Sequence, residues 1–294
     1  MKNKYAKKET IAAYIFLAPN IFGFLAVTLL PITASLFLSF TNWKLLEPPK
    51  FNGVDNFIKL FSEERFWTVM GNTLYYTVGA VPMGMLLALA FALLLNQQLR
   101  GIYMYRTIFF LPVVSSTVAV ALLWKWLYAK DIGLISYVLS MFGLEAPDFL
   151  FSTFWPMPSV IIMSIWKGLG YNIVLFLAGL QGISRTYYDA ATIDGASVWQ
   201  KFKSITLPLL SPTTFFILIM SVISSFQVFD QVFMLTAGGP AFKTSTIVYY
   251  IYTNGFVWYD MGYASSMAWL LFAMVLVITL FQWKIQERWV FYEQ

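Results

Sequence analysis

Polar side chains that could bind a polar solute lie at helical spacing within two long apolar segments of the sequence. In the first segment they are three or four residues apart, which places them on one face of a helix. The polar residues are Ser164, Lys167 and Tyr171, and Gly168 lies on the same face. In the second segment, hydroxyl, amide and carboxylate groups lie close together at Ser221, Ser224, Ser225, Gln227 and Asp230. Hydroxyl and amide groups beside an aromatic face suit a sugar, so both sets are candidate substrate contacts.

The same residues also have purely structural interpretations. A serine in a membrane helix can donate to its own backbone or to a neighbouring helix. Gly168 and Gly170 could serve only to let helices approach closely. The side chains of Lys167 and Asp230 could instead extend toward the outer membrane interface. The sequence leaves both interpretations open.

The composition argues against enzymatic chemistry. The chain has 294 residues with no histidine and no cysteine, which removes the commonest metal ligand and general base, and all thiol reactions. No acid pair or metal-ligand cluster has a suitable spacing, so we expect neither a metal site nor a resident cofactor. The basic residues give a net charge of +5 but are scattered, which argues against a nucleic-acid partner. We therefore predict a protein that is not an enzyme.

Long apolar segments must position the polar side chains. Charged residues make up 11% of the chain, against about 25% in a soluble domain. Six segments have the roughly 20 apolar residues that a spanning helix needs. We predict an all-α integral membrane protein with six transmembrane helices, forming one domain over residues 1–294. Gly84, Ala88 and Ala92 have a spacing typical of close helix packing or of a contact with another subunit. The predicted spans are residues 11–40, 69–95, 107–128, 159–183, 213–235 and 262–283.

Basic residues indicate how the spans are oriented. If both termini are cytoplasmic, the cytoplasmic segments hold 11 of the 19 Lys and Arg residues but 5 of the 14 acids, as the positive-inside rule requires. The run without charge from Thr10 to Trp43 is too long for a cleaved signal peptide, so we expect an uncleaved first span. This orientation makes the polar loop at residues 184–212 cytoplasmic.

That loop is the most informative motif in the chain. Its local signals predict two short helices, each beginning with a capping box, one at Thr186 and one at Ser197. Gly195 lies where the first helix needs a left-handed residue after its end. The two alanines after Asp189 leave a smooth surface that another protein could approach.

The order of residues in the loop resembles the EAA loop of membrane subunits of binding-protein-dependent ABC importers, above all those for carbohydrates. In that family the loop is a cytoplasmic coupling helix that docks into a cleft of the ATPase subunit. The resemblance therefore implies that these residues transmit motion and perform no chemistry. The first residue departs from the family by being aspartate instead of glutamate. The matching residues are Asp189, Ala190, Ala191, Asp194, Gly195 and Ala196.

The resemblance continues through most of the chain and implies its partners. The element from Thr236 to Pro240 is typical of the F-type subunit of the maltose transporter, which implies a heterodimer with a sister permease. The glycerol-3-phosphate transporter permease is similar. Further implied partners are an ATPase dimer, an extracytoplasmic solute-binding protein and a carbohydrate, such as an oligosaccharide or a sugar phosphate. Counted from these landmarks, the family's sugar contacts fall on Ser164, Lys167, Gly168 and Tyr171, and on Ser221, Ser224, Ser225 and Val228.

ATP is expected to bind a separate ATPase chain, because Phe242 stands where a phosphate-binding loop needs a glycine before its lysine. The implied location is the cytoplasmic membrane of a bacterium or archaeon. Two alternatives stay open: an ABC permease for another solute class, such as an amino acid or a polyamine, and an ion-coupled secondary transporter. The second would need buried carboxylate or histidine relays.

Overall fold

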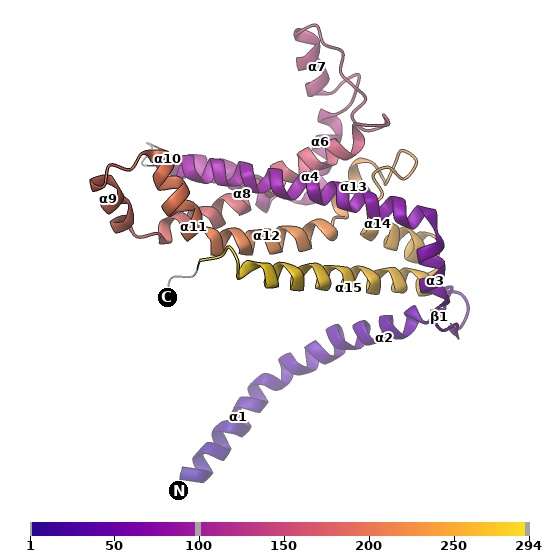
Figure 1. Cartoon of the computed structure of the whole chain (residues 1–294). Helices are drawn as coiled ribbons and strands as arrows, with labels where there is room; N and C mark the ends of the chain where they lie inside the picture. Colours follow the sequence, from indigo (N-terminus) through magenta and orange to yellow (C-terminus); the bar gives the residue numbers. More distant parts are fainter. Residues whose placement is uncertain (1, 98–100, 292–294) are drawn as a thin grey trace. The chain divides into compact units, whose positions relative to one another are not determined.

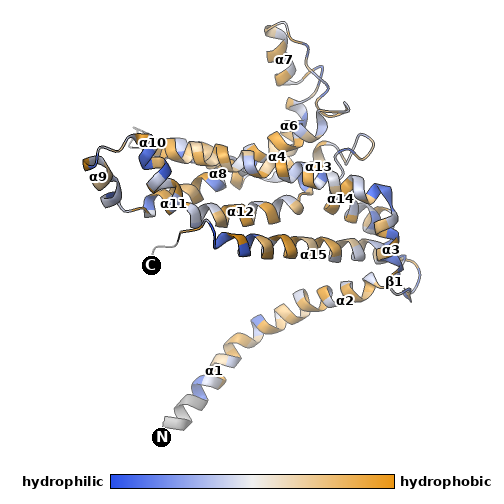
Figure 2. Ribbon diagram, in the orientation of Figure 1, coloured by the Kyte–Doolittle hydropathy of each residue, from blue (hydrophilic) through white to orange (hydrophobic). Residues whose placement is uncertain are grey.

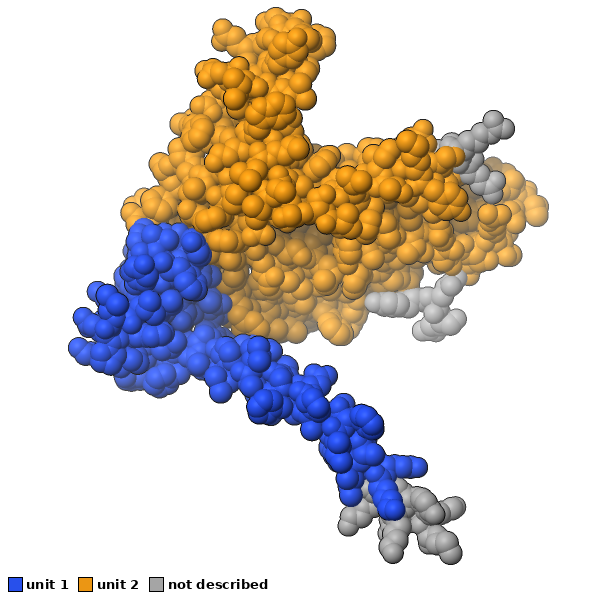
Figure 3. All heavy atoms as spheres, turned by 180° about the vertical axis from the view of Figure 1, so that it is seen from behind, with its two compact units in different colours: residues 1–62, 251–270 blue, residues 63–250, 271–294 orange. Residues whose placement is uncertain are grey.

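The computed structural model describes residues 2–97 and 101–291, and these are mostly helical (Figure 1). They fall into two compact units (Figure 3). Unit 1 comprises residues 1–62 and 251–270, and unit 2 comprises residues 63–250 and 271–294. The organisation of the chain as one domain stays a prediction.

Apolar helices of membrane-spanning length dominate the described residues, and hydrophobic colours cover most of their length in Figure 2. Four are long enough by themselves: Lys8–Ser39, Glu64–Leu95, Pro156–Gly182 and Met261–Gln286. Two bent pairs bring the number to as many as six: Ile102–Val114 with Thr117–Leu127, and Val198–Leu209 with Ser211–Phe226. The all-α membrane fold is confirmed. The four unbroken helices agree with the predicted spans to within five residues at each end.

Unit 1 contains the N-terminal helix and the segments that follow it. Its elements are α1 (Lys2–Gly23), η1 (Phe24–Leu29), α2 (Leu30–Ser39), β1 (Thr41–Asn42), β2 (Lys50–Phe51), α3 (Asp55–Ser62) and η3 (Thr253–Val257), with the adjoining parts of α14 and α15. The two strands pair antiparallel, with Thr41 opposite Phe51.

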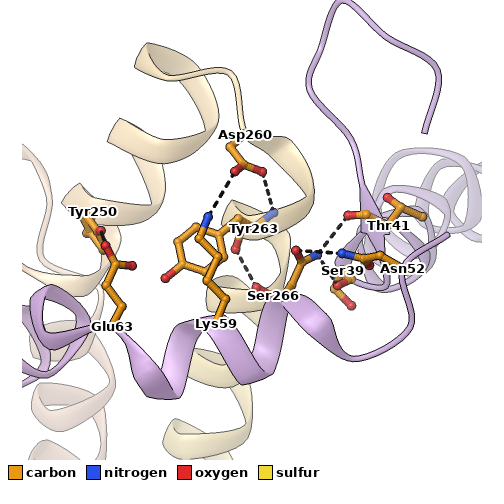
Figure 4. A network of polar contacts seen from close by, with 10 residues as sticks. Ser39, Thr41, Asn52, Lys59, Glu63, Tyr250, Asp260, Tyr263 and Ser266 are labelled. Carbon is orange, nitrogen blue, oxygen red and sulfur yellow. Dashed lines mark hydrogen bonds and ion pairs between the residues drawn. The ribbon is translucent and has the colours of Figure 1, made fainter. Parts of the chain in front are cut away.

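Polar contacts hold α3 in unit 1 (Figure 4). The buried amide of Asn56 donates to the carbonyl oxygens of Ser39 and Thr41, each at 2.9 Å. The ammonium of Lys59 lies 3.7 Å from a carboxylate oxygen of Asp260 and 4.2 Å from the ring centre of Tyr263. The Asn56 contacts are buried, so we expect them to contribute more to stability than the Lys59 ion pair.

Asn56→Ala should destabilise unit 1 by about 2–3 kcal/mol, because it leaves two buried carbonyl groups without their donor. Lys59→Gln serves as the control. The Lys59 side chain is 58% exposed, so its ion pair should contribute about 1 kcal/mol or less. Thermal unfolding of the purified protein in detergent compares the two variants. Equal loss of stability would contradict this ranking.

Unit 2 is built around α4 (Glu64–Leu95) and α8 (Pro156–Gly182), which pack along each other. Gly84, Ala88 and Ala92 are buried on α4, and the latter two belong to a core that α8 completes, which confirms the predicted close packing. On α8, a Cβ at Gly170 would collide with the Phe109 carbonyl oxygen. Glycine is therefore needed there for α5 (Ile102–Val114) to approach α8.

Further elements complete unit 2. The remaining ones are α6 (Thr117–Leu127), α7 (Leu134–Met141), α9 (Arg185–Ile193), α10 (Val198–Lys201), η2 (Phe202–Thr206), α11 (Leu207–Leu209), α12 (Ser211–Phe226), α13 (Asp230–Leu235), most of α14 (Ile247–Tyr252) and the later part of α15 (Met261–Gln286).

Two predicted spans are interrupted in the structure. The third, residues 107–128, is the pair α5 and α6, bent by 99°. The bend follows Pro112, which has no N–H to donate, and Ser115 is extended. The fifth, residues 213–235, is divided between α12 and α13. There the Thr246 hydroxyl donates at 3.0 Å to the carbonyl oxygen of Val228, which lies in the break. The apolar lengths were predicted, and the breaks were not.

Candidate functional site

A cavity of about 620 Å³ lies within unit 2. Side chains from α4, α8, α12 and α13 line it, with Val113 of α5. Both polar sets predicted from the sequence face this cavity, although they come from different segments. The nine residues are Ser164, Lys167, Gly168, Tyr171, Ser221, Ser224, Ser225, Gln227 and Asp230. The structure brings all of them together, while their part in binding stays a prediction.

Sequence reasoning missed the contribution of α4. Tyr76, Ala80 and Gly84 line the cavity at four-residue spacing, a pattern that places them on one helical face. A phenol inside an apolar span was the signal that could have revealed Tyr76. Asn172 and Gln231 also line the cavity, and each directly adjoins a predicted residue. They add amide groups to the lining.

The serines of the cavity fall into two classes. Ser164 donates to the Val160 carbonyl oxygen of its own helix at 2.7 Å. Ser225 is buried and donates to the Val222 carbonyl oxygen at 2.8 Å and to the Thr77 hydroxyl at 3.0 Å, so it joins α12 to α4. The structural interpretation thus applies to this pair. Ser221 is half-buried and Ser224 exposed, and neither hydroxyl has a protein partner among the described residues. These two are the hydroxyls best placed to bind a solute.

The side chain of Lys167 reaches the bend between α5 and α6. Its ammonium donates to the carbonyl oxygens of Pro112 at 3.3 Å and Ser115 at 3.1 Å. Carbonyls at the end of a helix lack intrahelical donors and carry partial negative charge, which favours a cation there. These bonds give Lys167 a structural role at the bend, and its contact with a solute stays a prediction.

The segment from Thr236 to Ser245 forms a folded loop on unit 2. Thr244 is fully buried and its hydroxyl lies 2.7 Å from that of Thr236 and 2.6 Å from the Gly239 carbonyl oxygen. Asn72 of α4 donates to the Phe242 carbonyl oxygen at 2.7 Å. These bonds satisfy backbone groups that have no helical partner. The motif that the sequence singled out therefore specifies a fixed loop conformation.

The first helix of the loop at residues 184–212 is α9, and its cap differs from the prediction. Ser184, not Thr186, is the N-cap residue, and its side chain accepts from the Thr186 amide at 3.3 Å. At the other end, Gly195 has the expected left-handed backbone, with φ of +75°. The amides of Gly195 and Ala196 donate to the carbonyls of Thr192 and Ala191. This pair of bonds is the Schellman motif.

The second helix of that loop begins as predicted. Ser197 and Gln200 form a capping box, in which each side chain accepts from the other's amide. The helical run continues through η2 and α11 to Leu209. The Tyr188 hydroxyl lies 2.9 Å from that of Thr206, and this bond holds α9 against the second helix.

The surface of this loop combines exposed polar and apolar groups. Asp189, Ala190, Asp194 and Gly195 are exposed, while Ala191 and Ala196 are half-buried. Three large apolar side chains beside them are also exposed: Ile193, Val198 and Trp199. Exposed apolar groups rimmed by polar ones are typical of a protein interface. The geometry suits docking to another protein.

Comparisons with known proteins agree over the whole length of the chain. The family model described as "Binding-protein-dependent transport system inner membrane component" matches residues 80–289. A probable ABC transporter permease, YesP of Bacillus subtilis (strain 168), is 38% identical over 300 residues, covering 99% of this chain and 96% of that protein. The lactose transport system permease LacF of Rhizobium radiobacter is 36% identical, covering 92% of this chain and 93% of that protein.

The fold also matches a solved structure. A chain from the crystal structure of a bacterial ABC transporter involved in the import of the acidic polysaccharide alginate gives a TM-score of 0.86 at 27% identity. The match covers 98% of this chain and 99% of that chain.

Proposed function

Because this chain belongs to the family of binding-protein-dependent transport system inner membrane components, we propose that it is the permease subunit of an ATP-driven importer for a carbohydrate. Its family and relatives are transport permeases, not enzymes. The observation that carries the proposal is the polar cavity among membrane-spanning helices. Polar groups are costly within a membrane unless they face a cavity or a partner. The hydroxyl, amide and phenol groups that line this cavity suit a sugar. Relatives named for lactose and for trehalose and maltose support that solute class.

The proposed cycle needs three partners. A binding protein delivers the sugar to the outer loops, including the segment from Thr236 to Ser245. A sister permease completes the translocation path. An ATPase dimer docks on α9 and its neighbours, and ATP-driven closure of that dimer moves the permeases between inward- and outward-open states. ATP drives this equilibrium through its higher affinity for the closed dimer. Asp189 and Gly195 transmit the motion and perform no chemistry.

Affinity purification of this subunit from its native membrane tests the proposal. We expect a second permease and an ATPase to purify with it in stoichiometric amounts, and mass spectrometry identifies both. Purification of the chain alone, in a form that transports sugar without ATP, would contradict the proposal and favour a secondary transporter.

The proposed orientation places both termini and α9 in the cytoplasm. The chain has no cysteine, so one introduced cysteine reports its own accessibility. Ser204→Cys should resist a membrane-impermeant maleimide in intact cells, whereas Glu145→Cys should react; both positions are exposed in the structure. Both should react after the membrane is permeabilised. The opposite pattern in intact cells would reverse the orientation.

A further inference from the structure

The position of Lys167 in α8 calls for a functional reason. It lies eleven residues after Pro156, where the helix begins, about 17 Å along the axis and within the apolar stretch that gives α8 the length of a membrane span. A charged side chain inside a span is costly, and such residues usually mark a solute path.

Nothing in the described part of the chain neutralises this charge. The ammonium has three N–H donors, and two donate to the carbonyl oxygens of Pro112 and Ser115. Those acceptors are neutral dipoles. Across the residues that the structure describes, no carboxylate lies within 4.0 Å of the Lys167 ammonium. The ammonium is therefore held in place by two hydrogen bonds and has one N–H donor left for another acceptor.

The remaining donor can serve a solute, because Lys167 lines the cavity. The cavity has one other charged side chain, Asp230, which is exposed at the first residue of α13. The two are not paired with each other. A carboxylate can accept from the hydroxyls of any sugar, charged or neutral. An ammonium group, by contrast, binds an anionic oxygen more strongly than a hydroxyl. The cation therefore distinguishes between solutes.

We infer that the transported carbohydrate carries an anionic group, a carboxylate or a phosphate, that pairs with Lys167 in the cavity. The inference rests on the proposed function and narrows its substrate class. The carbonyls of Pro112 and Ser115 position the ammonium, and the Asp230 carboxylate accepts hydrogen bonds from hydroxyl groups of the sugar ring.

Sugar binding to the purified complex tests this inference. The complex, with its co-purifying subunits but without binding protein, is placed in nanodiscs. Saturation-transfer NMR titrations then give Kd for glucose, glucuronate and glucose 6-phosphate, which share one ring. At least one anionic sugar should bind about tenfold or more tightly than glucose, because hydrogen bonds to charged groups are the stronger ones. The two anionic probes show whether carboxylate or phosphate is preferred.

Three variants separate the charge from its structural role. Lys167→Gln keeps an amide that can donate to the bend but removes the charge, so the preference should disappear while glucose binding persists. Lys167→Arg should keep the preference. Asp230→Asn should keep or increase it, because it removes a negative charge.

Two outcomes would overturn the inference. Equal affinities for all three sugars in the wild type would do so and leave the proposed function intact. Retention of the preference in Lys167→Gln would do the same. Binding of no sugar at all, charged or neutral, would count against the proposed function and the inference together.

Discussion

Replacing Gly195 with valine should lower sugar uptake by about 5- to 30-fold while the subunit still inserts into the membrane. Gly195 has φ of +75°, and a left-handed backbone costs other L-residues roughly 1–2 kcal/mol. That free energy corresponds to the stated range. A Cβ at this position meets no atom within 4 Å, so the effect comes from the backbone and not from crowding. The turn after α9 would change direction, and the surface proposed to dock on the ATPase would change with it.

Two further variants control for this effect. Gly195→Asn should keep most of the uptake, because asparagine tolerates the left-handed conformation. Gly182→Ala, at the end of α8, should also be tolerated, since a Cβ there meets no atom within 4 Å and its φ is not positive. Uptake by vesicles and subunit abundance on immunoblots are measured together. Normal uptake by Gly195→Val would refute the coupling role of this turn.

The second large effect is expected from filling the cavity. Gly168 lines it, and a Cβ there meets no atom within 4 Å. Gly168→Phe should therefore leave the fold intact and lower sugar uptake by more than about tenfold, because the ring occupies space that the solute needs.

Gly170 provides the matched comparison two residues along the same helix. Its Cβ would collide with the backbone of α5, so Gly170→Ala should lower the amount of folded protein. Size-exclusion chromatography measures folding, and vesicle uptake measures transport. The account requires Gly168→Phe to fold without transporting and Gly170→Ala to fold poorly. Normal uptake by a well-folded Gly168→Phe variant would show that the cavity is not the path.

Much of the fold could be predicted because the bilayer constrains it so strongly. A span must be long, apolar and helical, and these properties can be read directly from composition. Small residues at positions 84, 88 and 92 likewise predicted a close contact on α4, and the structure identifies α8 as the helix that packs on Ala88 and Ala92. The bend after Val114 and the break after Phe226 depend on tertiary partners. Lys167 and Thr246 supply those partners from segments distant in the sequence, so local patterns did not reveal them.

The candidate site was predictable to a similar extent. Helical spacing grouped the polar residues of α8, and the polar stretch near the end of the fifth predicted span grouped those of α12. Whether a given hydroxyl is free to bind a solute depends on the contacts that it makes in the folded protein. Ser224 and Ser225 are neighbours in sequence, yet only Ser225 donates to Thr77 of α4. The contribution of Tyr76 was missed because one phenol in an apolar span usually indicates packing.

ATP hydrolysis by the purified complex in lipid tests the central claim most directly. The complex is captured through this subunit, and hydrolysis is measured with the binding protein alone, with sugar alone and with both. The account predicts a marked rise only when sugar-loaded binding protein is present, with ATP-dependent uptake of the same sugar. Sugar transport without ATP, or hydrolysis that does not respond to the loaded binding protein, would contradict it.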